Sequence, residues 1–419
     1  MAKVRSLFWG IFICSSLVIA TAAGQSLRVE SGAFQFPNGK NRVRVPFKFI
    51  HNLVIIPVQI NNSKPFHFVL DTGVDRTLLV EVGLYDSIAL HDVEYLYLRG
   101  LGKGAGIEAI LSNGNTLKVA GVEARQQQLL VLEQNIFNIS AKVGMEVNGI
   151  IGYPLFKEFV VEIDYANKML SLYKPGFYPM KRAQKAVKVP LTIEDKKPYL
   201  KARAVAEDGK ATDVKLIVDS GMSSTMLLYP TTLPPSFVPH KTIESFLGNG
   251  LNGEIHGEIG RIKAISIGGF ELENPTASFP DSLSVRHALT LNNRNGNLGA
   301  DILHRFRVVF DYANSQMLLT PNYYFKKPFY FNLSGMEVMC PLPGHNFYAI
   351  ANVFPDSPAD KAGLKKGDNI VSINGEKCFE KSFTEVLDAL KSRPGRKIKL
   401  KITRDLKVIE TILHLEDVI

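Results

Sequence analysis

The chain has 419 residues, of which 46% are hydrophobic and 21% are charged, and its formal net charge is +9. The length accommodates two or three domains, and the composition is that of an ordinary globular protein with enough aromatic residues for a core. Because the basic residues are spread along the sequence rather than clustered, no nucleic-acid partner is expected.

The N-terminus has the pattern of an export signal. Lys3 and Arg5 precede an uncharged, mostly apolar run at residues 7–20, and small residues follow. The pattern predicts a signal peptide at residues 1–23 and a periplasmic or extracellular protein. The apolar run is shorter than the roughly 20 residues of a membrane span, so no span is expected after signal removal. An uncleaved signal that tethers the chain to a membrane is the alternative.

The first half of the chain has the composition of β structure. Runs rich in Val, Ile and Phe predict strands at residues 42–47, 53–60 and 66–70, and residues 61–65 break the run as a turn does. The third strand leads into the triplet Asp71-Thr72-Gly73. One such triplet is weak evidence for a site, since it occurs in many ordinary turns.

The second half repeats this arrangement. Its strand at residues 214–218 leads into Asp219-Ser220-Gly221, which lies 148 positions after the first triplet. A second motif, Asp-Tyr-Ala-Asn, occurs at residues 164–167 and again at 311–314, an offset of 147. Two anchors that agree within one residue indicate an internal duplication.

Two aspartates at matching points of a repeat predict a catalytic pair, Asp71 and Asp219. Two neighbouring carboxyl groups cannot both ionise easily, so they share a proton and can activate a water molecule between them. The glycines Gly73 and Gly221 let the backbone approach the carboxylates. The hydroxyls of Thr72 and Ser220 are expected to bond across the interface and hold both loops.

Residues 70–77 resemble the active-site segment of retroviral-type aspartic proteases. Residues 149–152 and 296–299 are similar to the apolar-apolar-Gly element behind the catalytic turn in that superfamily, although Asn297 replaces an apolar residue. The resemblance implies a mostly β fold with two tandem retropepsin/pepsin-like closed β-barrel lobes, at residues 25–175 and 185–322. It places Asp71 and Asp219 between the lobes and requires no metal or other cofactor.

Two further expectations follow from the resemblance. Hairpin flaps cover the cleft in this superfamily, and the candidates here are Gly102, Lys103 and Gly104 in the first lobe and Gly248, Asn249 and Gly250 in the second; plain surface hairpins are the alternative. Many members also carry a hydroxyl directly after the triplet, where this chain has Val74 and Met222. Fewer donors to the carboxylates predict raised pKa values for the pair and a pH optimum less acidic than that of digestive relatives.

The end of the chain, residues 336–419, resembles a bacterial PDZ domain, a small α+β module. The motifs are Ser357-Pro358-Ala359, Ala362-Gly363-Leu364 and Gly367-Asp368-Asn369-Ile370. Such domains bind a peptide end as an added strand. By analogy the groove lies between residues 347–351 and the helix at 383–390, which makes a C-terminal peptide a possible ligand. The groove candidates are Asn346, Phe347, Tyr348, Ala349, Phe383, Val386 and Leu387; a purely core role is the alternative.

Two smaller features leave alternatives open. The linker at residues 321–335 is rich in aromatic residues, which indicates that it packs against a domain rather than serving as a ligand platform. Cys14 lies in the signal, and Cys340 and Cys378 either pair or remain free thiols.

Together these features predict an exported aspartic endopeptidase that acts on protein or peptide substrates, with a PDZ domain that recruits them. The alternatives are a catalytically silent peptide-binding scaffold and a processing protease dedicated to one partner.

Overall fold

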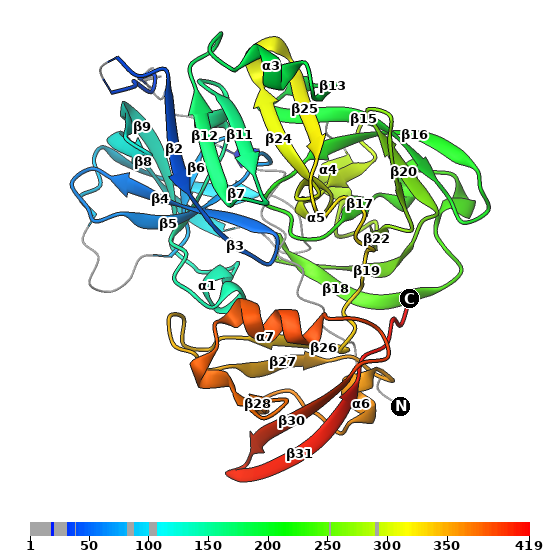
Figure 1. The fold of residues 1–419 in the computed structure, drawn as a ribbon. Coiled ribbons are helices and arrows are strands. Elements are labelled where there is room, and N and C mark those ends of the chain that lie inside the picture. Colours follow the sequence, from blue (N-terminus) through cyan, green and yellow to red (C-terminus); the bar gives the residue numbers. More distant parts are fainter. Residues whose placement is uncertain are drawn as a thin grey trace.

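The computed structural model describes residues 18–20, 32–37, 39–81, 88–99, 107–250, 253–289 and 293–419. Most of the predicted signal peptide, including Cys14, and the predicted flap residues Gly102, Lys103 and Gly104 lie outside the described residues. The fold is mostly β, with two large sheets, a sheet shared between them and a small C-terminal domain (Figure 1).

The first half forms a nine-stranded sheet with the order β1-β7-β8-β9-β6-β10-β5-β4-β3. An additional pairing of β8 with β4 closes six of these strands into a barrel. Inward-facing Val, Ile and Leu side chains fill it, in agreement with the strand patterns of the sequence. The strands are β1 (Val18–Ala20), β3 (Lys48–Ile50), β4 (Leu53–Ile60), β5 (Phe66–Leu70), β6 (Thr77–Leu79), β7 (Val93–Arg99), β8 (Ile107–Val119), β9 (Val122–Leu132) and β10 (Gly149–Ile151).

The second half forms a ten-stranded sheet in which the path β18-β19-β22-β17-β23-β16-β15-β20-β21 carries β14 beside β15. Among the described residues no strand pair closes this sheet, so the prediction of two closed barrels is correct for the first half only. The strands are β14 (Thr192–Glu194), β15 (Lys197–Val205), β16 (Ala211–Val218), β17 (Met226–Leu228), β18 (Thr242–Gly250), β19 (Gly253–Arg261), β20 (Ala264–Ile267), β21 (Phe270–Glu273), β22 (Thr276–Pro280) and β23 (Gly296–Leu298).

The two halves use the same strand pairings near the triplets. β10 is parallel to β5 and antiparallel to β6, and β23 is likewise parallel to β16 and antiparallel to β17. β6 is parallel to β9 as β17 is to β22. The structural correspondence matches the internal repeat read from the sequence.

A six-stranded sheet of order β13-β25-β24-β11-β12-β2 joins the halves, because β11 of the first pairs with β24 of the second. Each predicted Asp-Tyr-Ala-Asn turn connects two strands of this sheet, β11 with β12 and β24 with β25. We call the three sheets together the body. The strands are β2 (Arg42–Pro46), β11 (Val160–Asp164), β12 (Met169–Tyr173), β13 (Val187–Pro190), β24 (Phe306–Asp311) and β25 (Gln316–Pro321).

Short helices connect the strands of the body. The helices are α1 (Ile139–Val143), α2 (Tyr153–Phe156), α3 (Met180–Ala183), α4 (Arg286–Leu289) and α5 (Ala300–Leu303), with 3₁₀ turns at Pro230–Thr232, Pro235–Phe237 and Tyr312–Asn314. Helices α2 and α5 follow β10 and β23 and correspond to the one short helix predicted for each repeat.

The C-terminal domain is a sheet of order β26-β27-β28-β30-β31, with β29 beside β28 and two helices. Ser357 caps α6, and Ser382 forms a capping box with Glu385 at the start of α7. Helix α7 faces the body, close to α1 (Figure 1). The elements are β26 (Met336–Met339), β27 (Ala349–Val353), α6 (Pro358–Lys361), β28 (Asn369–Ile373), β29 (Glu376–Lys377), a 3₁₀ turn (Cys378–Glu380), α7 (Phe383–Leu390), β30 (Lys397–Arg404) and β31 (Lys407–His414).

The structure bears on both features that the sequence left open. The linker packs on the second half: Phe329 and Phe331 are buried, and the Arg305 guanidinium lies 3.5 Å from the centre of the Phe329 ring. Cys340 and Cys378 are buried free thiols. In the part of the chain that the structure describes, no helix has the length and apolar character needed to cross a membrane.

Candidate functional site

The two triplets lie at the ends of corresponding strands. Asp71 follows β5, and its backbone amide donates to the Ile151 carbonyl at 2.9 Å. Asp219 follows β16, and its amide donates to the Leu298 carbonyl at 2.8 Å. The β10 and β23 segments therefore lie directly behind the two aspartates, as the resemblance implied.

Hydrogen bonds between Thr72 and Ser220 join the two triplets. Thr72 Oγ1 donates to the Val218 carbonyl at 2.6 Å, and Ser220 Oγ donates to the Leu70 carbonyl at 2.9 Å. In return, each hydroxyl oxygen accepts the backbone amide of the opposite residue at 3.0 Å. This reciprocal bonding confirms the cross-interface bonding expected of the two hydroxyls and fixes the halves relative to one another.

The two carboxyl groups meet in the interior, and neither Asp71 nor Asp219 exposes any surface. The Gly73 amide donates to Asp71 Oδ1 at 2.6 Å. A methyl group at Gly221 would lie 2.2 Å from the Asp71 carboxyl carbon, whereas one at Gly73 would lie 3.1 Å from that of Asp219. Each carboxyl group thus packs over the glycine of the other half, with much less clearance at Gly221.

Burial dominates the electrostatics of the pair. It raises the pKa of Asp71 well above the ordinary value, and the charge of Asp219 raises it further. Burial also raises the pKa of Asp219 to about 6, although the hydrogen bond from Asn297 opposes the shift. The asymmetry favours a state at neutral pH in which Asp71 is protonated and Asp219 is ionised.

Sequence reasoning missed Asn297 and Arg294. Asn297 Nδ2 donates to Asp219 Oδ2 at 2.8 Å, and the positive charge of the buried Arg294 also lowers the pKa of Asp219. The sequence contained one sign of the role of Asn297, since it is a polar residue in the element at residues 296–299 where an apolar residue is expected. The absence of a hydroxyl at Val74 and Met222 is therefore compensated on the Asp219 side only.

Replacement of Asn297 by leucine is expected to raise the pKa of Asp219 above about 6, since the carboxylate loses a hydrogen bond to its charged form. The change should be about 1 pKa unit, the magnitude of one charge-assisted hydrogen bond. NMR titration of aspartate carboxyl carbons measures it. Asn295→Leu, at a neighbouring asparagine that bonds to Lys215 and Thr232 instead, is the control and should leave this pKa unchanged.

The second predicted flap is a hairpin of β18 and β19, as expected for either a flap or a surface hairpin. Asn249, near its tip, donates to the Ile136 carbonyl of the first half at 3.1 Å, so the hairpin reaches across to the other half. Since both aspartates are fully buried, a ligand reaches them only after surrounding segments move.

The predicted PDZ groove is misplaced. β27 is hydrogen-bonded to β26 on one side and β28 on the other, so it has no free edge for a peptide strand. The two edge strands of the sheet are β26 and β31, and β26 is the edge next to the predicted groove strand. Of the predicted groove residues, Leu387 lines the cavity beside β26. Tyr348, Phe383 and Val386 belong to the core of the domain, and Ala349 lies in β27. Asn346 bonds to the Phe379 carbonyl, and Phe347 is exposed.

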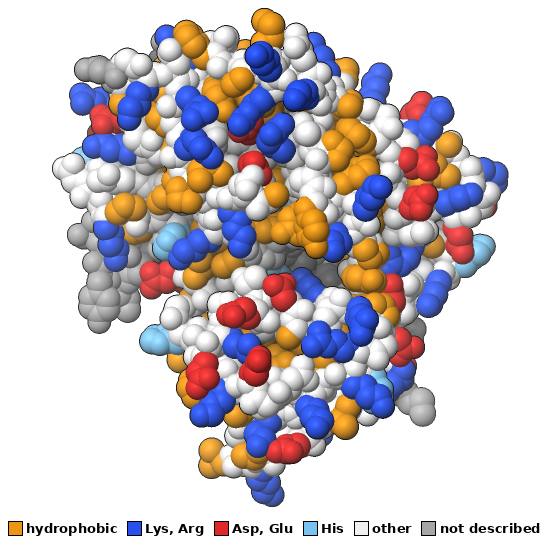
Figure 2. All heavy atoms as spheres, viewed as in Figure 1, with side chains coloured by type: hydrophobic (Ala, Val, Ile, Leu, Met, Phe, Trp, Pro, Cys, Tyr) orange, Lys and Arg blue, Asp and Glu red, His pale blue; other side chains and the backbone are white. Residues whose placement is uncertain are grey.

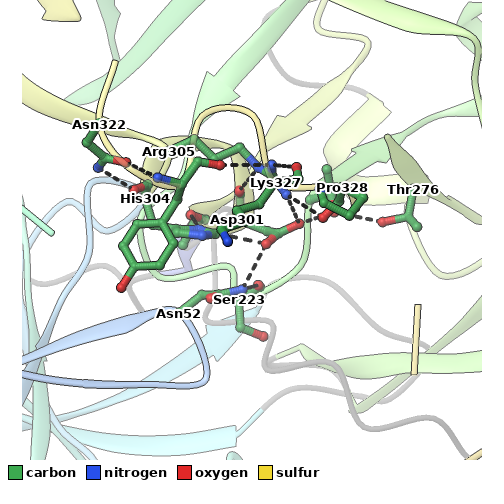
Figure 3. A network of polar contacts seen from close by, with 12 residues as sticks. Asn52, Ser223, Thr276, Asp301, His304, Arg305, Asn322, Lys327 and Pro328 are labelled. Atoms are coloured by element: carbon green, nitrogen blue, oxygen red, sulfur yellow. Dashed lines mark hydrogen bonds and ion pairs between the residues drawn. The ribbon is translucent and has the colours of Figure 1, made fainter. Parts of the chain in front are cut away.

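A cavity of about 550 Å³ lies between this open edge and the body. β26 and α7 form one wall, and α1, the 223–226 segment and the α5 region form the other. The surface is hollowed between the PDZ domain and the body (Figure 2). Asp301 stands in the body wall, where its carboxylate accepts hydrogen bonds from Asn52 and Thr225 and its backbone carbonyl accepts one from Arg305 Nε (Figure 3).

Comparison with known proteins identifies relatives among proteases. A Brucella suis protein named as a putative zinc metalloprotease is 36% identical over 81 residues, 19% of each chain. The carboxy-terminal processing protease CtpB of Bacillus subtilis is 40% identical over 55 residues, and the zinc metalloprotease RasP of Geobacillus kaustophilus is 34% identical over 58 residues. These matches cover 13% and 14% of this chain, and 12% and 13% of the two relatives. The chain thus spans less than a fifth of the length of the curated relatives that it matches.

The comparisons contradict the predicted enzyme class. The relatives are named as zinc metalloproteases and as a carboxy-terminal processing protease, and none of these names is that of an aspartic protease. The prediction of an aspartic endopeptidase is therefore wrong, and the pH optimum expected for that class falls with it. Within the described residues, no group of three His, Cys, Asp or Glu side chains is placed to hold a metal ion.

The comparisons support the C-terminal module directly. The family model of the PDZ domain matches residues 350–404. The sheet with its two capped helices and the helix-start motif at Ser357 lie in and around this range. The chain therefore contains a PDZ domain.

Proposed function

We propose that the chain binds extended peptides through its PDZ domain, with the ligand added as a strand to β26 beside α7. The observation that carries this proposal is that β26 is an edge strand of the sheet and lines a cavity of about 550 Å³. Strand addition supplies main-chain hydrogen bonds, and a cavity of this size is typical of ligand sites. Apolar side chains from both elements, Val338 and Leu387 among them, line the cavity.

Obstruction of the cavity should abolish peptide binding. Thr384 of α7 lines the cavity and is not part of the buried core, so Thr384→Trp fills the space without disturbing the fold. We expect the full chain to retain peptides from a random hexapeptide library and the variant to lose at least about ten-fold in affinity, as expected when a bulky group blocks a site. Leu406→Trp, at a residue that is 98% exposed, is the matched control. Equal binding by both variants would contradict the proposed groove.

We further propose that Asp71 and Asp219 form an acid–base centre, supported by Thr72, Gly73, Ser220 and Gly221. A buried pair that holds one proton can accept a proton at Asp219 and donate one from Asp71. A difference titration tests this acid–base centre. At pH 7 wild type should bind one more proton than Asp71→Asn, and equal proton counts would reject the centre.

We also propose that the two halves are copies of one retropepsin-like lobe, because their strand pairings match.

We also propose that residues 1–23 direct export, as the leader pattern predicts. N-terminal sequencing of protein recovered outside the cytoplasm of an expressing bacterium should begin near residue 24. Recovery of the chain only with an intact N-terminus in the membrane fraction would favour the tethered alternative.

A further inference from the structure

The cavity between the PDZ domain and the body carries an excess of positive charge. The charged side chains among its described lining residues are five basic ones, Lys142, Lys168, Arg305, Lys327 and Lys391, and three acidic ones, Asp301, Glu337 and Asp388. A site with net positive charge and apolar walls suits a ligand with an apolar body and an anionic end.

Arg305 and Asp301 are already committed to the structure of the body. The Arg305 guanidinium donates to the carbonyls of Tyr324, Lys327 and Pro328 and packs on Phe329 (Figure 3). Asp301 accepts from Thr225 at 2.8 Å. These two residues therefore make a rigid wall and leave the recognition of an anion to other cations.

Lys142 of α1 is one of the basic residues of the body in the cavity wall. Its side chain is 7% exposed, and burial lowers its pKa to about 8, an effect that Glu337 of β26 partly offsets. Its ammonium group is thus charged at neutral pH in a place where charge is costly, and a second anion would be favourable there.

His51 stands in the same wall. Its Nε2 atom is buried and has no hydrogen-bond partner among the described residues. Burial lowers the pKa of His51 to about 3, so the ring is neutral and can donate one N–H. Because this nitrogen is buried, a ligand atom can bond to it only after the neighbouring side chains move aside.

Backbone amides in the loop before β26 are already hydrogen-bonded within the domain, so they are not available to a peptide carboxylate. The Met336 amide donates to Ser334 Oγ at 3.3 Å, and the Gly335 amide donates to the Asn332 carbonyl at 3.0 Å. At the other end of β26, the Cys340 amide donates to the Ala141 carbonyl of α1 at 2.8 Å. Capture of a peptide carboxylate by backbone amides alone is therefore disfavoured at this loop.

We propose that the C-terminal carboxylate of a bound peptide is received by Lys142, with His51 beside it, so that the peptide site is composed jointly by the PDZ domain and the body. The proposal rests on the peptide binding proposed above and names its ligand class: a peptide with a free carboxylate and an apolar last residue. Met336, Val338, Leu387 and Leu390 form the apolar wall.

The composite site also connects the peptide with the carboxyl pair. Ser223, Ser224 and Thr225, which follow Asp219 on the same loop, line the cavity. Helix α1 leads through a short segment into β10, whose Ile151 carbonyl binds the Asp71 amide. A peptide end in the cavity thus contacts segments that lead to both aspartates.

The test offers the full chain, immobilised, an equimolar library of random hexapeptides in which half end in a carboxylate and half in an amide. Retained peptides are identified by mass spectrometry. We expect carboxylate forms to be enriched about ten-fold or more, the effect of one hydrogen-bonded charge pair, and Lys142→Gln to abolish the enrichment. Lys397→Gln, an exposed lysine of β30 away from the cavity, should retain it.

The outcomes separate the two proposals. Equal retention of carboxylate and amide forms by wild type, or enrichment that survives in Lys142→Gln, would overturn the composite site and leave peptide binding intact. No retention of either form would overturn the peptide-binding function itself. A thermal unfolding curve of Lys142→Gln that matches wild type shows that lost enrichment does not arise from unfolding.

Discussion

Replacement of Gly221 by alanine is expected to destabilise the protein by about 3 kcal/mol or more, whereas the same change at Gly73 should cost about 1 kcal/mol. An added methyl at Gly221 would lie 2.2 Å from the Asp71 carboxyl carbon, but one at Gly73 would clear that of Asp219 by 3.1 Å. Because Asp71 is fully buried and its loop is bonded to the opposite half, it has little room to move. Urea unfolding of the two variants measures both free energies.

The pair of glycines provides its own control. Both changes are chemically identical, lie at equivalent positions and lower the entropy of the unfolded chain equally. A difference between them therefore reports the clearance of the methyl group. Equal destabilisation of the two variants would contradict the close packing of Asp71 over Gly221.

Replacement of Asp219 by asparagine is expected to stabilise the protein at pH 7 by about 3 kcal/mol, and to have little effect at pH 4. The pKa of Asp219 is raised from 3.8 to about 6. A raised carboxyl pKa contributes stability below the unfolded value, and this stability is lost as the pH rises through about 6. Asparagine is neutral throughout and can still accept the hydrogen bond from Asn297.

Urea unfolding of wild type and Asp219→Asn at intervals between pH 4 and pH 8 measures the effect. The wild-type free energy of unfolding should fall through this window more steeply than that of the variant. Asp405→Asn, at an exposed turn residue with a positive φ of 48° that asparagine tolerates, should preserve the wild-type slope. A variant that parallels wild type would mean that Asp219 has an ordinary pKa.

The sequence was informative wherever a pattern had one structural meaning. Two triplets at the same point of a repeat predicted the meeting of Asp71 and Asp219, and the hydroxyls of Thr72 and Ser220 form the predicted bonds between the halves. The role of Asn297 was not predicted, because its side-chain direction depends on the exact register between β23 and β16. The sequence showed only that a polar residue replaced an apolar one.

The PDZ groove was misplaced for a topological reason. Residues 347–351 have the pattern of a strand, but a pattern does not reveal whether that strand lies at the edge of its sheet. Pairing of Met336–Met339 with β27 moved the open edge by one strand. The cavity could not be predicted from the sequence, since Lys142 and His51 of the body form it together with a domain that begins at residue 336.

The enzyme class was predicted from a short motif and the chemistry that two carboxylates allow, and the names of the relatives contradict it. Those relatives match a minor part of the chain, 19% or less. The physical properties of the carboxyl pair can be measured without reference to any class of enzyme.

NMR titration of the protein with ¹³C-labelled aspartate carboxyl groups measures whether the buried pair shares one proton, with Asp71→Asn and Asp219→Asn to assign the two signals. We expect Asp219 to titrate near pH 6 and Asp71 to remain protonated at that pH, because burial and the charge of its partner favour the protonated form of Asp71. Two signals that both titrate near the ordinary value of 3.8 would contradict a buried pair that shares one proton.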